Sequence, residues 1–112
     1  MSNPIGVSSP SIIPDSFFRA STVYRSSYQP AYARLNDYRG GIWCALKSDN
    51  TPNDWLQIDF GKIVEVCGVA TQGNSYEWIT EFKLSFSFSG DNWESYKDTR
   101  GVIMVRFILL IV

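Results

Sequence analysis

Turn-forming residues interrupt this chain about every ten residues, and no segment keeps the i, i+3, i+4, i+7 apolar spacing of an amphipathic helix. Segments of alternating apolar and polar residues are easy to find instead, and each is bounded by Gly, Asn, Asp or Ser. Short strands separated by such turns are typical of β-sandwiches and β-barrels. The sequence therefore predicts an all-β fold with almost no helix.

The expected strands begin with residues 55–60, which alternate and stop at Gly61-Lys62, and continue with a separate strand over Ile63–Ala70. In Ile79–Phe88 the alternation places one set of side chains on the core face and the other set on the opposite face. The core set is Phe82, Leu84, Phe86 and Phe88, and the opposite set is Lys83, Ser85 and Ser87. Ser89-Gly90-Asp91-Asn92 then predicts a hairpin turn before Trp93–Tyr96.

The two ends of the chain differ in character. Residues 102–112 are apolar apart from Arg106, but this run is far shorter than the about 20 residues that a membrane-spanning helix needs. We expect either a buried strand or a non-native tail there. Met1–Ser16 has neither the basic region nor the apolar region of a signal peptide.

Catalytic chemistry has few candidate residues. The chain contains no histidine, which excludes Ser-His-Asp and Cys-His nucleophiles and every His-ligated metal site. Carboxylates remain as acid–base candidates, but the sequence places no pair of them as glycoside hydrolysis requires. These carboxylates are Asp49, Asp54, Asp59, Glu77 and Glu81. We therefore expect no enzymatic activity.

No cofactor is expected either, because the chain has no phosphate-binding glycine motif and no Cys-x-x-Cys zinc pair. Calcium stays an open alternative, since it takes oxygen ligands from loops, although loop residues of this kind are usually just solvated. The candidate ligands are Asn36, Asp37, Asp49, Asn50 and Asp91.

The charge is low and uneven. A net charge of −1 and a pI near 5.2 exclude the electrostatic footprint of a nucleic-acid-binding protein. Residues 1–43 carry four Arg against two Asp, a net charge of +2. This basic part suits an anionic or polar ligand, but ordinary surface charge explains it as well.

Aromatic residues make up 15% of the chain, and many of them lie in two loop-like stretches. The first stretch runs from Val23 through Tyr24, Arg25, Ser26, Ser27 and Tyr28 to Pro30 and is followed by Tyr32. The second is Asn74, Ser75, Tyr76, Glu77 and Trp78. Tyr and Trp among small polar residues make good recognition surfaces. The alternative is that these rings cap the ends of a small core.

The two cysteines allow two interpretations. Cys44 and Cys67 form either one disulfide or two buried thiols.

Eight blocks of residues resemble one known family, in the family's order. They are Ile13-Pro14-Asp15-Ser16, Ala20-Ser21, Ala33-Arg34-Leu35-Asn36, Gly41-Ile42-Trp43, residues 55–61 (WLQIDFG), residues 68–73 (GVATQG), residues 78–84 (WITEFKL) and Gly90-Asp91-Asn92-Trp93. The chain resembles the discoidin domain, also called the coagulation factor V/VIII type C domain. The resemblance covers residues 4–100.

The resemblance implies a galactose-binding-like jelly-roll β-sandwich in an extracellular or cell-surface protein. It implies a non-enzymatic recognition or cell-adhesion module that binds carbohydrate or a cell-surface or matrix protein through loops called spikes. Phosphatidylserine membranes are an alternative ligand, and a second alternative is a carbohydrate-binding accessory of an absent hydrolase. The polar and aromatic residues of the predicted loops favour sugar or protein over lipid.

Carried over residue by residue, the resemblance places spikes on Val23–Tyr28 and on Asn74–Trp78, with a neighbouring loop on Gly40–Trp43. It makes Arg34 and Asp59 framework residues, which we expect to form a buried ion pair. Trp55, Phe82, Phe86 and Trp93 are expected in the core. The resemblance also implies a disulfide between Cys44 and Cys67.

The resemblance stops after Arg100, where the family domain would continue for several more strands. The two cysteines that usually join the family's ends are missing, and Met1 stands at the position of the first. We therefore expect a partial domain over residues 4–100 and an apolar tail of unclear origin over residues 101–112.

Overall fold

The computed structural model describes residues 6–7, 9–35, 42–46, 53–66, 69, 71–72, 81–96 and 103–111. Strands dominate these residues, and the helices among them are two short 3-10 turns, so the all-β prediction is confirmed. The elements are η1 (Asp15–Phe17), β1 (Phe18–Ala20), η2 (Pro30–Ala33), β2 (Trp55–Val66), β3 (Lys83–Ser87), β4 (Glu94–Ser95) and β5 (Ile103–Ile111). No helix in this part of the chain is long and apolar enough to cross a membrane.

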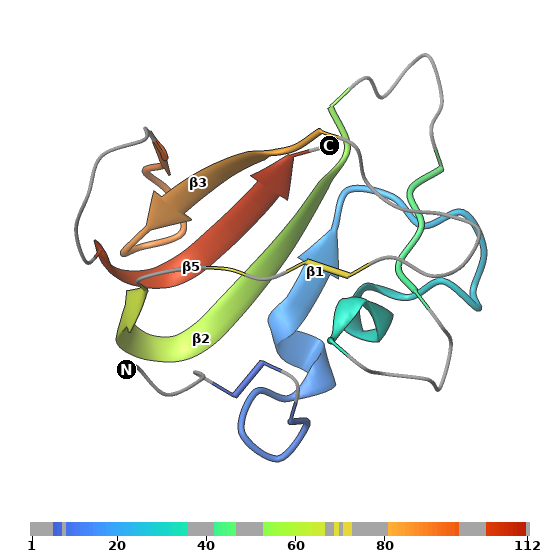
Figure 1. The fold of residues 1–112 in the computed structure, drawn as a ribbon, viewed down its shortest axis with the longest axis horizontal. Coiled ribbons are helices and arrows are strands. Elements are labelled where there is room, and N and C mark those ends of the chain that lie inside the picture. Colours follow the sequence, from blue (N-terminus) through green and yellow to red (C-terminus); the bar gives the residue numbers. More distant parts are fainter. Residues whose placement is uncertain are drawn as a thin grey trace.

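The strands form one five-stranded antiparallel sheet in the order β1-β2-β5-β3-β4. Figure 1 shows β5, the last strand in the sequence, between β2 and β3. Leu110 pairs with Leu56 of β2 on one side and with Leu84 of β3 on the other. Of our two expectations for the apolar C-terminal run, the strand is confirmed, although among its described side chains only Val105 and Ile108 are buried and Met104 is 43% exposed. The sheet thus continues past the domain boundary that we placed at residue 100, and that boundary stays a prediction.

β2 is a single strand of 12 residues, so our prediction of two strands that end and begin around Gly61 was wrong. The pairing with β5 shifts between Asp59 and Val64, which marks an irregularity in the ladder rather than a reversal of the chain. Gly61 lies in this irregular part with a φ of +78°, and its N–H donates to Oδ1 of Asp59 at 2.7 Å. A glycine followed by a lysine fits a turn or a bulge equally well, and here it forms a bulge.

The core lies between the sheet and the N-terminal segment. Its larger cluster joins residues from both: Ile13, Phe18, Ala31, Phe60, Val66, Phe86, Val105 and Ile108. A smaller cluster of Trp43, Ala45 and Leu56 lies near the end of β1, where Ala20 and Val23 pack against it. Residues that were expected on separate strands therefore meet on one face of a strongly bent sheet (Figure 1).

The hairpin at Ser89–Asn92 is confirmed, because β3 and β4 pair antiparallel across it. The expected faces of this region are partly wrong. Phe86 is buried, but Phe82 and Phe88 are 39% and 61% exposed, whereas Ser85 and Ser87 are buried. β3 spans only Lys83–Ser87, so both exposed phenylalanines lie beyond its ends.

The expected core tryptophans, Trp55 and Trp93, are half-buried. The Trp93 ring meets the Phe107 ring edge to face, with centroids 6.3 Å apart, and its Nε1 donates to the Gly90 carbonyl at 3.1 Å. Trp93 thus joins the hairpin turn to β5.

The predicted ion pair between Arg34 and Asp59 was wrong. Arg34 is buried as expected, but its guanidinium bonds the Asp15 carboxylate at 2.7 Å and the carbonyls of Val7 and Ile13 at 2.6 Å each. Asp59 pairs instead with Arg106 of β5. The reason is the central place of β5, which brings an arginine from the C-terminal run beside Asp59.

Candidate functional site

The predicted recognition loop, Val23–Tyr28, follows β1 after Ser21 and Thr22 and presents polar and aromatic side chains to solvent. Tyr24 is 46% exposed, and Arg25, Ser26 and Ser27 are also exposed. Val23 is half-buried and packs against the smaller core cluster, so it fixes the start of the loop. The structure therefore gives four of the six predicted loop residues an accessible surface.

The two tyrosines of this loop form one unit. Their ring centroids lie 5.8 Å apart with an interplanar angle of 64°, which is an edge-to-face pair. A turn holds this spacing, because the Tyr28 N–H donates to the Arg25 carbonyl at 2.9 Å. The Arg25 guanidinium carbon lies 5.0 Å from the Tyr24 ring centroid, within cation–π range. Tyr24, Arg25 and Tyr28 thus form a defined cluster, which we call the Tyr-Arg-Tyr cluster.

Trp43 packs at the base of this loop. Its side chain is buried in the smaller core cluster, and its Nε1 donates to the Thr22 carbonyl at 3.0 Å. Beside it the Tyr24 N–H donates to the Cys44 carbonyl at 2.7 Å. This burial argues against the direct ligand contact that we predicted for Trp43 and gives it a supporting role.

A buried carboxylate anchors the base of the loop. Oδ1 of Asp54 accepts hydrogen bonds from the Ser21 and Thr22 hydroxyls, each at 2.7 Å. These hydroxyls also accept backbone donors, the Trp55 N–H at 2.9 Å and the Leu46 N–H at 3.0 Å. Asp54 therefore ties three chain segments together just before the loop.

Sequence reasoning missed this support, since the residues involved are more than 30 positions apart in the chain. A Ser-Thr pair that precedes an aromatic loop was the available signal, but nothing in the sequence identified Asp54 as its acceptor.

Several predicted site residues lie outside the described part of the chain. They are Asn74, Ser75 and Tyr76 of the second loop, Cys67 of the expected disulfide, and the calcium candidates Asn36, Asp37, Asp49 and Asn50. The second spike and the Cys44–Cys67 bridge stay predictions.

Asp91, the remaining calcium candidate, is exposed in the β3–β4 turn, where its N–H donates to the Ser89 hydroxyl at 3.1 Å. Over the ranges that the structure describes, no group of three or more His, Cys, Asp or Glu gathers to hold a metal.

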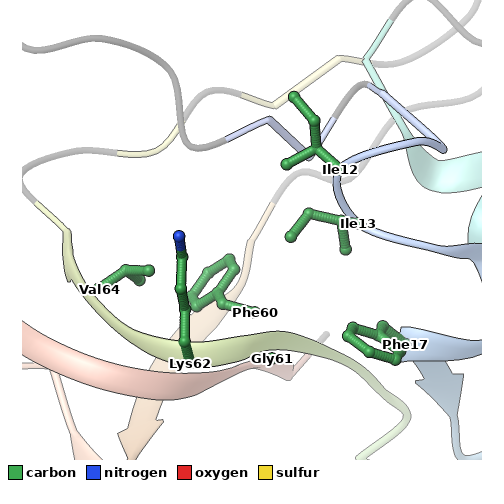
Figure 2. Close-up of a pocket in the computed structure, with 7 residues that line it drawn as sticks. All are labelled: Ile12, Ile13, Phe17, Phe60, Gly61, Lys62 and Val64. Atoms are coloured by element: carbon green, nitrogen blue, oxygen red, sulfur yellow. The ribbon is translucent and has the colours of Figure 1, made fainter.

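The structure also contains an open pocket that the sequence did not predict. It has a volume of about 330 Å³ and lies between the N-terminal segment and the bulged part of β2, as Figure 2 shows. β1 connects the two sites, because Phe17 of the pocket precedes this strand and the Tyr-Arg-Tyr cluster follows it. The residues that line the pocket are Ile12, Ile13, Phe17, Phe60, Gly61, Lys62 and Val64.

Solved structures with a similar fold include carbohydrate-binding modules. A mutant of chitosan-binding module 1, derived from a chitosanase/glucanase of Paenibacillus sp. IK-5, superposes with a TM-score of 0.60 at 10% identity. The match covers 84% of this chain and 78% of that one. CpGH89CBM32-5 of Clostridium perfringens, in complex with GalNAc-β-1,3-galactose, gives a TM-score of 0.54 at 13% identity over 88% and 86% of the two chains.

A protein described as a glycoside hydrolase gives a TM-score of 0.55 at 14% identity, and the match covers 84% of this chain but only 27% of the hydrolase. At these identities the likeness concerns the fold, and together with the family match it confirms the expected galactose-binding-like jelly-roll architecture. The family model of the F5/8 type C domain matches residues 18–105, which is well over half of the chain. The discoidin resemblance is thereby confirmed, and the chain belongs to the F5/8 type C domain family.

Proposed function

We propose that this protein is a non-enzymatic carbohydrate-binding module whose ligand contacts the Val23–Tyr28 loop. The observation that carries the proposal is the Tyr-Arg-Tyr cluster, an aromatic pair in which Tyr24 is exposed and Tyr28 half-buried, with a guanidinium against the exposed ring, on a loop anchored at its base. The similar modules that bind chitosan or GalNAc-β-1,3-galactose support the same ligand class.

The chemistry of the cluster suits a sugar. Aromatic rings pack against the apolar C–H face of a pyranose, while nearby polar groups bond its hydroxyls. Tyr24 supplies an exposed ring, and the exposed Arg25, Ser26 and Ser27 supply donors and acceptors beside it. Because the edge-to-face contact and the turn already fix both rings, little side-chain freedom remains to be lost on binding.

Two of the five candidate carboxylates, Asp54 and Asp59, support a role without catalysis. Asp54 is buried and accepts two hydroxyl donors, and Asp59 is bound to Arg106 and to the Gly61 N–H. Both carboxylates therefore have structural partners. Hydrolysis of a glycoside by the usual route needs two carboxylates that converge on one bond.

The test of this proposal also distinguishes two other ligand classes, phosphatidylserine membranes and cell-surface proteins. A phosphatidylserine membrane would favour large apolar side chains at the loop tip, whereas this tip carries Arg25, Ser26 and Ser27. A protein ligand at a cell surface would agree with an extracellular location and a role in adhesion. As an accessory module, the chain would direct a separate hydrolase to its substrate.

The test is a glycan array run beside phosphatidylserine liposomes, with the wild-type chain and Tyr24→Ala/Tyr28→Ala. We expect the wild type to bind glycan and the double variant to lose at least tenfold in affinity, because packing of aromatic rings against the sugar dominates such contacts. Tyr96→Ala is the matched control, since Tyr96 is similarly exposed and also forms an edge-to-face pair, with Phe86.

Circular dichroism with a thermal scan checks that every variant folds. Equal glycan binding by the wild type and the double variant would refute the loop as the site. Binding to the liposomes alone would replace the carbohydrate by a lipid headgroup as the ligand.

A further inference from the structure

The open pocket beyond the start of β1 is separate from the Tyr-Arg-Tyr cluster and has a different chemical character. The side chains that line it are apolar apart from Lys62, with Ile12, Ile13 and Phe17 on the N-terminal side and Phe60 and Val64 on the β2 side. Its volume, about 330 Å³, lies near the lower end of the range for small-molecule sites, about 300–1,000 Å³. It therefore suits a small ligand rather than a segment of another protein.

The β2 side of the pocket depends on the bulge. Gly61 has a φ of +78°, and a Cβ atom built there would lie 2.9 Å from Cε2 of Phe17. The absent side chain lets the Phe17 ring lie directly against the β2 backbone. The ring closes one end of the pocket, as Figure 2 shows.

The opposite wall is held in place by the buried Arg34. Its Nη1 donates to the Val7 carbonyl and its Nη2 to the Ile13 carbonyl, each at 2.6 Å, so the wall segment is fixed at two points. The Ile13 N–H also donates to the Ser9 carbonyl at 3.0 Å. The Ile13 part of the wall is therefore held in place without a ligand.

Lys62 gives this apolar pocket a positive charge. Figure 2 shows its side chain rising from β2 between Val64 and Phe60, on the side of the strand that faces Ile12 and Ile13. Among the residues that the structure describes, the ion pairs join Asp15 to Arg34 and Asp59 to Arg106, and neither of them involves Lys62. An ammonium group at the mouth of an apolar pocket favours an anion attached to an apolar body.

We propose that this pocket binds a small single-chain amphiphile, an unbranched hydrocarbon with a terminal carboxylate of the fatty-acid class. The hydrocarbon lies against the isoleucines, Phe17, Phe60 and Val64, and the carboxylate pairs with the Lys62 ammonium. The proposal stands on the charge complementarity and the apolar walls, so it does not depend on what the Val23–Tyr28 loop binds.

The test is a titration of the full chain, labelled with ¹⁵N, with sodium octanoate, sodium hexanoate and 1-octanol, followed by NMR. We expect the Gly61, Lys62 and Val64 amide signals to shift in saturable fashion with octanoate. Hexanoate should bind more weakly by about fourfold for each missing methylene.

The Lys62→Met variant should bind octanoate about fivefold more weakly than the wild type and 1-octanol equally well. Lys62→Arg should restore octanoate binding. Lys83→Met is the matched control, because Lys83 is an exposed lysine at the start of β3 and does not line the pocket.

Two results would overturn the proposal. The first is the absence of saturable shifts at the Gly61, Lys62 and Val64 signals with octanoate. The second is an equal loss of octanoate affinity in Lys62→Met and Lys83→Met, which would mean a general effect of net charge. Thermal unfolding that matches the wild type shows that each variant is folded, and unchanged signals of the Val23–Tyr28 loop in the titration separate this pocket from the proposed carbohydrate site.

Discussion

Asp59 of β2 and Arg106 of β5 form a two-point ion pair across the centre of the sheet. Nε of Arg106 lies 3.0 Å from Oδ1 of Asp59, and its Nη2 lies 3.2 Å from Oδ2. The pair lies at the register shift between Asp59 and Val64, where the ladder between the two strands is interrupted. It therefore joins the strands where their regular backbone pairing is interrupted.

This pair predicts a specific loss of stability in acid. Burial alone would raise the pKa of the Asp59 carboxyl, but the hydrogen bonds from Arg106 and from the Gly61 N–H, together with the Arg106 charge, lower it below its ordinary value of 3.8. Because the folded-state pKa lies below the unfolded one, the stabilisation is complete above the unfolded pKa and is lost as the pH falls through the folded pKa.

The measurement is urea unfolding at pH 7 and pH 3 for the wild type and Arg106→Met. We expect the wild type to lose more free energy of unfolding between these pH values than Arg106→Met does. Arg19→Met, which removes an exposed arginine of β1, should behave like the wild type. An identical pH dependence in the wild type and Arg106→Met would contradict the assignment.

Arg34 predicts a large loss of stability on truncation. The residue is 3% exposed, and Arg34→Met would leave the carbonyls of Val7 and Ile13 and the Asp15 carboxylate without this donor. Loss of one side of a buried charged network costs about 3–5 kcal/mol, and half-exposed Asp15 places the expected value near the lower bound, about 3 kcal/mol. Urea unfolding measures it, with Arg19→Met again as the control. A loss no larger than that of the control would show that Arg34 does not hold the N-terminal segment.

The hydrogen bonds of Thr22 at the base of the loop predict that this residue affects both stability and ligand binding. Thr22→Val keeps the shape of the side chain but removes the donor to Asp54 and the acceptor for the Leu46 N–H. We expect a loss of about 1–3 kcal/mol in the free energy of unfolding and weaker glycan binding, because the loop base loosens. Thr71→Val, at an exposed threonine, should change neither quantity. If Thr22→Val is destabilised but binds glycan as well as the wild type, the hydrogen bonds at the base of the loop do not affect ligand binding.

The backbone conformation of Gly61 predicts a loss of stability when this residue is replaced. Gly61→Ala places a side chain at positive φ and against the Phe17 ring, so we expect it to lower the free energy of unfolding by about 1–3 kcal/mol. Adding Phe17→Leu to the Gly61→Ala variant should recover the part of this stability loss that arises from the contact with the ring. The part that arises from the positive φ should remain. Denaturant unfolding of the single and double variants measures this coupling, and simple additivity of the two changes would argue against the contact.

The sequence predicted the local features best. The hairpin at Ser89–Asn92 followed from its turn residues, and the aromatic loop followed from tyrosines set among Ser and Arg. The predicted β2 break failed because Gly61 permits either a turn or a bulge, and the neighbouring strand decides between them. Local reasoning succeeds where the backbone conformation depends on adjacent residues only.

Partners that are distant in sequence could not be predicted. Asp59 meets Arg106 because β5 enters the sheet beside β2, and nothing within either segment specifies that choice. The same holds for Asp54 and its two hydroxyl donors. The pocket, too, needs two segments that meet only in the folded chain, and Lys62 alone resembles any exposed lysine.

The central position of β5 has a consequence for synthesis of the protein. β2 and β3 cannot be joined until residues 103–111 have left the ribosome, because β5 pairs with both. Until then a nascent chain carries two unpaired strand edges, which are open to pairing with other chains. The sheet is therefore completed late and through contacts of long sequence separation, which fold slowly. Expression of this domain should accordingly respond more to chaperone capacity than to the strength of its individual turns.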